Sequence, residues 1–536
     1  MIPLLTLLHT AQAQELQAVH TRTADIRALH VTGEVILAAT AGGLEFYGAD
    51  GTRLAHVVRE LPGSDLVAVG EHQGALAVGS ERQGAAQWTG HSFDTLVPAG
   101  EHATSSIVAF TQEHWVTRGG SLSGAPELEG LATDAVDWQG GVLVGTQEGY
   151  LHHVVDGVSR TSLMPCPVVD LYADEGPEGE VVRIACITQS FLLHPDGSLE
   201  GQRVKATAAG PGVFGTADGA LVGPDGVIGR VPGRISAIER VGEAWFVGTQ
   251  DGLYRLEQDL ERLTPEGQIC GNFVTGAAEF QGELVVTTFQ RGACRFDGQR
   301  WHDIEGLPST LVNDVVVYEG QAWFATSGGL AAWDGQNVTT FPGEPWGIPR
   351  GAPGTSNEAI TALAVGSERL WIADVVGPDS VEDGYWRRHR LSVYGTSYQD
   401  VTACGKRAWV ASEDAGVSQW TGRSWQHHDG RGGLPDDWVM AVACEGREAW
   451  AGTYDEGLWH YDGAQWSEIQ VPDGWSLALA RGEGGVWYGT LGGLFWVEDS
   501  GSVRGLWTPD PRVHQVSVLG SLLAVGSEGG LALYSL

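Results

Sequence analysis

The stretch AWAGTYDEGLWHYDGAQW, residues 449–466, holds three tryptophans, two adjacent acids and an Asp-Gly pair. Related stretches recur along the chain, among them AWFVGTQDGLYRL from Ala244, AWFATSGGLAAWDGQNV from Ala322 and VWYGTLGGLFWV from Val486. With weaker copies included, about fourteen units follow one another at a spacing of roughly 37 residues. A fixed period of this length indicates a solenoid or a propeller.

Each unit reads as four short strands, labelled a to d in chain order. In the opening stretch, AWAGT is strand b, GLWHY is strand c and QWSEI is strand d, and an earlier apolar run such as VMAVAC supplies strand a. Asp462-Gly463 supplies the positive φ angles of a tight hairpin turn, and Gly457 allows a sharp turn into strand c. Four antiparallel strands repeated radially predict an all-β fold of β-propeller type.

Fourteen blades exceed the four to eight of one ring, so we expect two seven-bladed propellers. The expected division places the first propeller at residues 14–263 and the second at residues 264–536. The last unit, GLALYSL, stops after strand c, and ELQAVHT (15–21) is a strand without a blade. That strand could complete the last blade, and an alternative arrangement then puts the first and last blades in one ring.

The composition restricts the classes of partner. The chain has 536 residues and a formal net charge of −36, which repels phosphate backbones and disfavours nucleic-acid binding. Residues 1–13 have the apolar run and the small-x-small end of a signal peptide, and no later apolar run has the roughly 18 residues of a membrane span. We therefore expect an extracytoplasmic protein, in the periplasm, at the cell surface or secreted, without membrane insertion.

The six cysteines fall into three local pairs when they are placed on the repeat. An even number of cysteines in an exported chain is compatible with disulfides, and no spacing suggests a zinc site. Free, buried cysteines are the alternative. The expected disulfides are Cys166–Cys186, Cys270–Cys294 and Cys404–Cys444.

The pattern WxGTxxGLxxxDGxxW at 450–466 and its copies resemble the two-component regulator propeller repeat. That family forms the paired seven-bladed sensor regions of extracytoplasmic hybrid histidine kinases. The resemblance covers roughly residues 15–536, and it implies the sensing of a ligand or partner, with glycans a frequent ligand class. No membrane span, immunoglobulin-like linker or kinase follows in this chain, so the resemblance carries over the fold and a binding role.

The repeat is interrupted most strongly at FPGEPWGIPRGAPGTSNE (341–358) and DVVGPDSVEDG (374–384). The first connects two blades and the second is predicted to be a b–c loop, so both would emerge on one propeller face. Long loops on a rigid scaffold commonly carry binding residues. The positively charged run YWRRHR follows, and it could bind a carboxylate or sulfate. The candidate ligand-binding residues are Trp346, Arg350, Asp379, Tyr385, Trp386, Arg387, Arg388 and His389. The alternative is that the YWRRHR run is a strand c with alternating exposed arginines.

The opening acids, Asp455 and Glu456, fall in a b–c loop, where acids recur without fixed positions. They are interpreted as loop surface, with a cation site at the channel mouth as the alternative. We predict no cofactor and no metal ligand set; Ca²⁺ would suit an acidic surface, but no stretch has EF-hand spacing. The sequence also lacks GxSxG, HExxH and a Gly-rich phosphate loop.

The favoured function is therefore a non-catalytic, sensor-like or scaffold-like double propeller that binds a protein, a glycan or a small molecule through loops on one face. The alternative is a propeller lyase or glycan-active hydrolase with its site at a channel mouth. Three or more His, Glu, Tyr or Arg side chains that converge at a mouth would favour the enzyme. An open, aromatic-lined or merely acidic mouth would favour binding.

Overall fold

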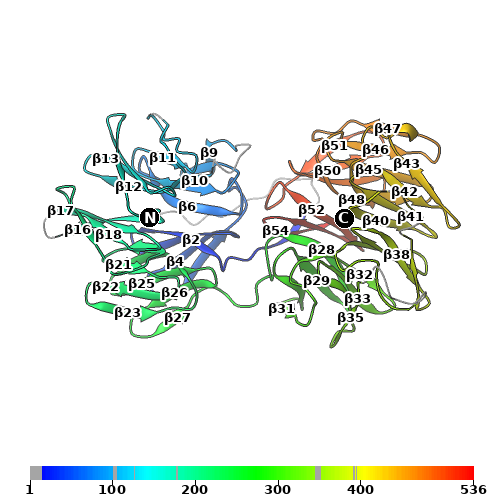
Figure 1. Cartoon of the computed structure of the whole chain (residues 1–536), viewed down its shortest axis with the longest axis horizontal. Helices are drawn as coiled ribbons and strands as arrows, with labels where there is room; N and C mark the ends of the chain where they lie inside the picture. The colour runs from blue at the N-terminus through cyan, green and yellow to red at the C-terminus, as the bar shows by residue number, and fades with distance from the viewer. Residues whose placement is uncertain are drawn as a thin grey trace. The chain divides into compact units, whose positions relative to one another are not determined.

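In the computed structural model of the chain, the description covers residues 15–99, 106–125, 127–176, 179–343, 352–389, 393 and 395–536. The chain divides into two compact units. The first propeller is Arg22–Glu266, and the second is Gly267–Leu536 together with residues 15–21. In Figure 1 the colour runs from blue to green through the sheets of the first propeller and from green to red through those of the second.

The blade that contains the opening stretch shows how the repeat folds. Strands β44 (Val439–Glu445), β45 (Glu448–Thr453), β46 (Leu458–Tyr461) and β47 (Trp466–Ile469) pair in chain order. Gly457 and Gly463 have φ angles of 75° and 96°, as the two turns require. Trp450 and Trp466 are buried between this sheet and the sheets of the two neighbouring blades. The tryptophans of the repeat are therefore inter-blade core residues.

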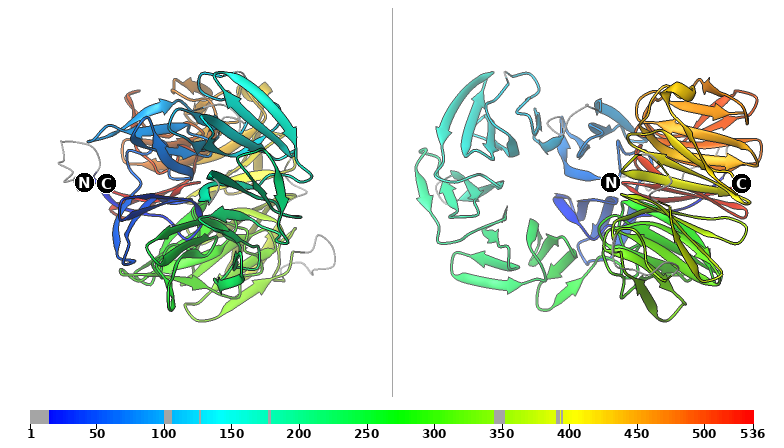
Figure 2. Two further views of the ribbon diagram at one scale, coloured as in Figure 1. Left: turned by 90° about the vertical axis from the view of Figure 1, so that its left-hand side faces the viewer. Right: turned by 45° about the vertical axis from the view of Figure 1, so that its right-hand side comes forward.

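The first propeller has seven sheets, and six of them have four strands in the described residues. Figure 2 (right) shows these sheets arranged about a common centre. The first to third sheets are β2 (Ile26–Thr32), β3 (Val35–Thr40), β4 (Gly43–Gly48), β5 (Arg53–Val57); β6 (Leu66–His72), β7 (Ala75–Ser80), β8 (Ala85–Trp88), β9 (Phe93–Val97); and β10 (Ile107–Phe110), β11 (Trp115–Thr117). The fourth and fifth are β12 (Ala132–Trp138), β13 (Gly141–Thr146), β14 (Tyr150–Val155), β15 (Val158–Leu163); and β16 (Asp170–Gly176), β17 (Gly179–Ala185), β18 (Phe191–Leu193), β19 (Leu199–Gly201). The sixth and seventh are β20 (Ala208–Gly210), β21 (Val213–Gly215), β22 (Ala220–Gly223), β23 (Gly226–Arg230); and β24 (Ile235–Val241), β25 (Ala244–Thr249), β26 (Gly252–Leu256), β27 (Leu260–Arg262).

The second propeller also has seven sheets, all four-stranded. The first three are β28 (Val274–Phe280), β29 (Glu283–Thr288), β30 (Gly292–Phe296), β31 (Trp301–Ile304); β32 (Val312–Tyr318), β33 (Gln321–Thr326), β34 (Gly329–Trp333), β35 (Val338–Phe341); and β36 (Ile360–Val365), β37 (Leu370–Asp374), β38 (Gly377–Glu382), β39 (Tyr385–Arg388). The next are β40 (Tyr398–Cys404), β41 (Arg407–Ser412), β42 (Val417–Trp420), β43 (Trp425–His428); the blade β44–β47; and β48 (Ser476–Gly482), β49 (Gly485–Thr490), β50 (Leu494–Glu498), β51 (Val503–Leu506). A short 3-10 helix, η2 (Gly430–Gly432), follows β43.

The seventh sheet of the second propeller is closed by the N-terminal strand. Strand β1 (Leu16–His20) pairs antiparallel with β54 (Gly530–Ser535), which follows β52 (Val513–Leu519) and β53 (Leu522–Ser527). Residues 15–21 thus supply strand d of the last blade and lie with the second propeller, outside the first. Strand β2 of the first blade packs against β24 of the seventh blade of the first propeller.

The prediction of an all-β chain with two seven-bladed propellers is confirmed. No α-helix occurs in the described ranges, and none of their helices is long and apolar enough to cross a membrane.

Candidate functional site

The interrupted segment that the sequence singled out lies in the third blade of the second propeller. Trp346 and Arg350 lie outside the described residues. Residues 377–382, predicted as part of a loop, form strand β38, so that prediction is wrong, and the YWRRHR run begins strand d rather than strand c. Pro378 fits within the strand because it needs only its carbonyl, which accepts a hydrogen bond of 2.9 Å from the His389 backbone N–H.

Asp379 and Arg388 are brought together, and both hold the preceding connection in place. Asp379 is 1% exposed, and its carboxylate accepts hydrogen bonds from the backbone N–H and the hydroxyl of Ser356. The Arg388 guanidinium donates to the Gly354 carbonyl at 2.7 Å. Burial and the neighbouring Asp374 raise the pKa of Asp379 to about 8. These contacts give both side chains a structural function in fixing residues 354–356 to the blade.

The remaining candidates alternate across strand β39. Tyr385 and Arg387 are exposed, whereas Trp386 is buried against Phe341, with the ring centroids 5.0 Å apart. Because adjacent residues of a strand point to opposite faces, Arg387 and Arg388 do not form one basic surface. Their binding of an anion stays a prediction.

The buried His389 takes part in an inter-blade contact instead. Its Nδ1 accepts a hydrogen bond of 3.3 Å from the indole of Trp425 in the next blade, and its Nε2 lies 3.0 Å from the Ser380 hydroxyl. Burial, with Arg387 and Arg369 nearby, lowers the pKa of His389 to about 3. The imidazole is therefore neutral, as an acceptor must be.

The inner rim of each propeller is built from two recurring positions. The first residue after strand b donates its backbone N–H to the carbonyl of the residue before strand a of the same blade. Examples are Tyr454 to Trp438 at 3.0 Å and Leu491 to Trp475 at 3.3 Å. The d–a and b–c connections thereby meet at the mouth of the central channel, and their side chains decide what the mouth offers to a ligand.

Three aromatic side chains on adjacent blades of the second propeller form a row at this rim, here called the aromatic row: Trp438, Tyr454 and Trp475. The Trp438 and Tyr454 rings are stacked, with centroids 4.0 Å apart and an interplanar angle of 11°. The Tyr454 and Trp475 centroids are 4.8 Å apart. Trp438 and Trp475 are 36% and 43% exposed, in contrast to the buried tryptophans of the repeat. The two tryptophans and Tyr454 thus give this part of the rim an aromatic surface that is open to solvent.

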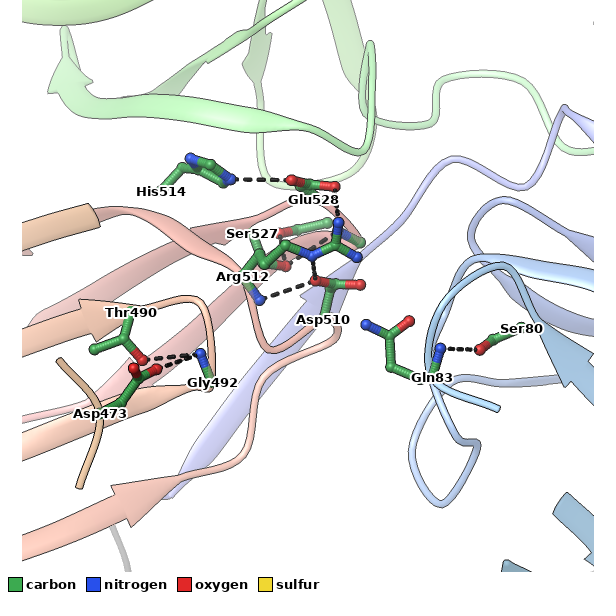
Figure 3. Close-up of polar contacts among 12 residues, drawn as sticks. Ser80, Gln83, Asp473, Thr490, Gly492, Asp510, Arg512, His514, Ser527 and Glu528 are labelled. Atoms are coloured by element: carbon green, nitrogen blue, oxygen red, sulfur yellow. Dashed lines mark hydrogen bonds and ion pairs between the residues drawn. The ribbon is translucent and has the colours of Figure 1, made fainter. Parts of the chain in front are cut away.

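Neither tryptophan of the row is held loosely. The Asp473 carboxylate accepts from the Trp475 backbone N–H at 3.0 Å and from the Gly492 N–H at 2.7 Å. Figure 3 shows the Asp473 carboxylate and the Thr490 hydroxyl beside the backbone N–H of Gly492 in the b–c turn. Asp436 accepts from the Trp438 N–H at 2.9 Å in the same way. The row is thus preorganised, which lowers the entropy lost on binding.

Farther along the same rim, charged side chains of the last blade converge on one another. Glu528 lies 3.2 Å from Nε2 of His514 and 2.9 Å from the guanidinium of Arg512, which also pairs with the buried Asp510 at 3.4 Å (Figure 3). The His514 ring packs on Phe273 at 4.5 Å. His514, Glu528 and Arg512 therefore converge here. Each of them is paired with another member of the group that these three side chains form with Asp510.

The two central channels have similar volumes of about 690 Å³ and are lined by strand a of each blade. Their buried carboxylates bridge blades: Asp134 accepts from the Leu171 N–H at 2.8 Å in the first propeller, and Asp400 accepts from the Val442 N–H at 2.8 Å in the second. Burial raises the pKa of Asp400 to about 7 and that of Asp134 well above its usual range. We interpret these acids as structural links around each ring.

The mouth of the first propeller is charged instead of aromatic. The Arg27 guanidinium lies 2.7 Å from Asp65 and 3.3 Å from Glu81, and its Nε lies 3.2 Å from Asp25. Burial raises the pKa of Asp65 to about 7, and the neighbouring carboxyl group of Glu81 contributes to this rise.

All three expected cysteine pairs are disulfides. Cys166 and Cys186 join the segments before β16 and after β17 in one blade. Cys270 is disulfide-bonded to Cys294. The structure places Cys294 on strand β30 rather than in a connection between strands. Cys404 and Cys444 join strands a of adjacent blades. No group of three or more His, Cys, Asp or Glu side chains that could hold a metal ion occurs among the described residues.

The sequence did not single out the aromatic row. Trp438 and Trp475 stand in irregular segments before strand a, and Tyr454 occupies a b–c position that varies between blades, with Gln147, Phe289 and Glu528 among its counterparts. The signal was available only by aligning the blades, because both tryptophans then fall at one repeat position.

These features define the class of protein as a double seven-bladed β-propeller with an aromatic channel mouth. No protein-family model matches the chain, and no curated protein matches it.

Solved structures do resemble it. PorZ, described as an essential bacterial surface component of the type-IX secretion system of Porphyromonas gingivalis, is 14% identical, with a TM-score of 0.68 over 97% of this chain and 86% of its own. The GH74 xyloglucanase from Xanthomonas campestris is 12% identical, with a TM-score of 0.63 over 98% of this chain and 100% of its own.

An extracellular domain assigned to a hybrid two component system of B. thetaiotaomicron is 15% identical, with 96% and 82% coverage and a TM-score of 0.43. The kind of sensor that the repeat resembles is thus represented among the structural neighbours. At these identities the likenesses show the fold, and a TM-score of 0.43 carries no argument about function.

Proposed function

We propose that the protein is an extracytoplasmic, non-catalytic binding protein, sensor-like or scaffold-like, that holds its ligand at the channel mouth of the second propeller. The observation that carries this proposal is the aromatic row, because two exposed tryptophans and the half-buried Tyr454 between them provide contact area at little conformational cost. The three disulfides support maturation in an oxidising compartment outside the cytoplasm. An aromatic-lined mouth is the arrangement expected for binding, whereas the convergence of Arg512, His514 and Glu528 on the same rim is the arrangement expected for an enzyme. The ion pairs among these three side chains leave none of them free to act on a substrate.

The test is a photo-crosslinker placed at the rim of the protein in the organism that produces it. p-Benzoylphenylalanine at Tyr454 should give an adduct of defined mass, identified by mass spectrometry. The matched control carries the same group at Tyr385, which is 47% exposed on the outer strand of another blade. Equal crosslinking at both positions, or none at either, would contradict a binding site at the mouth.

A glycan-active hydrolase is the second candidate, and Asp65 is the observation that favours it. A carboxyl group with a pKa of about 7 can donate a proton near neutral pH, as a general acid must. The ion pairs of Asp65 and Glu81 with one nitrogen of Arg27, at 2.7 and 3.3 Å, argue against this function, because the fold already engages both carboxyl groups. Release of reducing ends from xyloglucan by the wild-type protein, lost in Asp65→Asn, would establish the hydrolase; we expect no release.

A further inference from the structure

The surroundings of the aromatic row are strongly acidic. Asp436 and Asp437 precede Trp438, Asp455 and Glu456 follow Tyr454, and Asp473 lies two residues before Trp475. The three connections that carry the row (429–438, 454–457 and 470–475) contain six acids and a single basic residue, Arg431. Every ring of the row therefore has a carboxylate within two residues of it in the chain.

Only some of these acids take part in hydrogen bonds that hold the fold. Asp436 and Asp473 accept backbone hydrogen bonds, and Asp437 accepts from the Gly430 N–H at 2.8 Å. Asp455 and Glu456, by contrast, are exposed, and their side chains make no ion pair with any residue that the structure describes. Their charges are available to a ligand.

The chemistry that fits aromatic faces beside carboxylates is that of guanidinium and ammonium groups. A cation over the face of a Trp or Tyr ring is attracted by the ring quadrupole, and a carboxylate at its edge can pair with it. The net charge of −36 steers cations toward the protein and anions away from it. A neutral sugar would gain nothing from this field.

The arrangement of the rings favours a chain over a small cation. A cage for one cation surrounds it with rings, whereas here the centroids follow one another in steps of 4.0 and 4.8 Å. Because Trp438 and Tyr454 stack face to face at 4.0 Å, no cation fits between them, and the side chains of an extended segment would lie on the outer faces and edges of the row. We propose that the aromatic row and the acids Asp455 and Glu456 bind a basic, arginine- or lysine-bearing segment of a partner polypeptide. This inference rests on the proposed function and names its ligand class.

The test measures binding of the full-length protein to a nine-residue arginine peptide by calorimetry, with a Gly-Ser peptide and xyloglucan oligosaccharides as comparisons. Wild type should bind the arginine peptide only, and binding should weaken at least tenfold between 50 and 500 mM salt. Trp438→Ala/Trp475→Ala should abolish the binding. Asp455→Asn/Glu456→Gln should weaken it at least tenfold.

The matched control is Asp383→Asn/Glu483→Gln, which removes the same charge from exposed turns at the other ends of blades of the same propeller. It should change the affinity less than twofold. Equal weakening by the control pair would overturn the proposal in favour of non-specific attraction. Binding of the neutral oligosaccharide that depends on Trp438 and Trp475 but not on Asp455 and Glu456 would overturn the basic-segment inference and leave the proposed function standing. If the wild-type protein neither binds the arginine peptide nor gives the crosslink at Tyr454, the proposed function and the basic-segment inference are both refuted.

Discussion

At the scale of single residues, a histidine that accepts an indole N–H is a repeated means of joining blades. His20, His389 and His428 each accept on Nδ1 from a tryptophan of the next blade, at 3.3 Å in all three cases. Burial lowers the pKa of all three, to about 3 for His389 and about 4 for His428. Protonation would replace the acceptor with a second donor, so each contact requires neutral imidazole.

These histidines predict a loss of stability in mild acid. In the unfolded chain the pKa of His389 is about 6.5. Below that pH the unfolded state therefore binds a proton that the folded state does not bind. The contribution of His389 to the free energy of unfolding is fully present above about pH 6.5. It is lost as the pH falls toward the pKa of His389 in the folded state. Between pH 7.5 and 5 the loss should be about 1–2 kcal/mol. Urea unfolding of wild type and His389→Asn at both pH values checks this: the variant should show a smaller drop, and an equal drop would contradict it.

At the scale of elements, the inner strands of neighbouring blades are joined by carboxylates. Asp400 accepts from the Val401 and Val442 backbone N–H groups, both at 2.8 Å, and Asp314 does the same with Val315 and Leu363, at 2.7 and 2.8 Å. In each case one bond stays in the strand and the other crosses to the next blade. The need to link neighbouring blades explains why buried carboxylates line the central channel.

Asp400→Ala should therefore destabilise the second propeller by about 2–4 kcal/mol, because two buried N–H groups lose their acceptor. Asp303→Ala, on the exposed outer strand β31, is the control and should stay within about 0.5 kcal/mol of wild type. Calorimetric unfolding measures both variants. If the two variants unfold alike, Asp400 does not link the blades.

The pH dependence at Asp400 has the opposite sign to that at His389. Burial raises the folded pKa to about 7, whereas the unfolded value is about 3.9, so the folded state binds the extra proton between these values. The contribution of Asp400 to stability is present at pH 4 and falls as the pH rises through 7. The stability advantage of wild type over Asp400→Asn should accordingly shrink between pH 5 and pH 8, as measured by urea unfolding.

The elements also show how far a sequence can be read. The repeat AWAGT…GLWHY predicts β45 and β46, and the Asp-Gly turns predict their hairpins, because local periodicity and turn chemistry determine these features. Strand β38 lies within the segment predicted as a loop; Gly377 and Pro378 are typical of turns, yet ladder pairing with β37 holds them in a sheet. Trp438 and Tyr454, sixteen residues apart in the sequence, stack only because the blade brings its d–a and b–c connections together, and no local pattern reports that.

At the scale of the whole molecule, two rings share one chain, and the second is sealed by residues from the opposite end of the sequence. Ala18 pairs with Leu533 and His20 with Leu531, and His20 also accepts from Trp301 of the neighbouring blade. Strand β1 thus completes the sheet of the last blade. Through His20, it also joins the last blade to the first blade of the second propeller.

Deletion of residues 15–21 should lower the unfolding temperature of the second propeller and leave that of the first unchanged, because the strand pairs only with β54. Differential scanning calorimetry should resolve two transitions, with only one shifted. A synthetic peptide of residues 15–21 added in excess should restore that transition, since it binds the folded ring alone. A uniform shift of both transitions would show that the strand does not belong to one ring.

This closure has a consequence for synthesis. Strand β1 is synthesised roughly 510 residues before its partner β54, so at about 5–20 residues per second the strand waits tens of seconds for it. The first propeller is complete long before, at Glu266, and can fold during that interval. A chain that terminates early, at any point before Gly530, cannot seal its second ring. Ring closure therefore takes place only after synthesis has passed through β54.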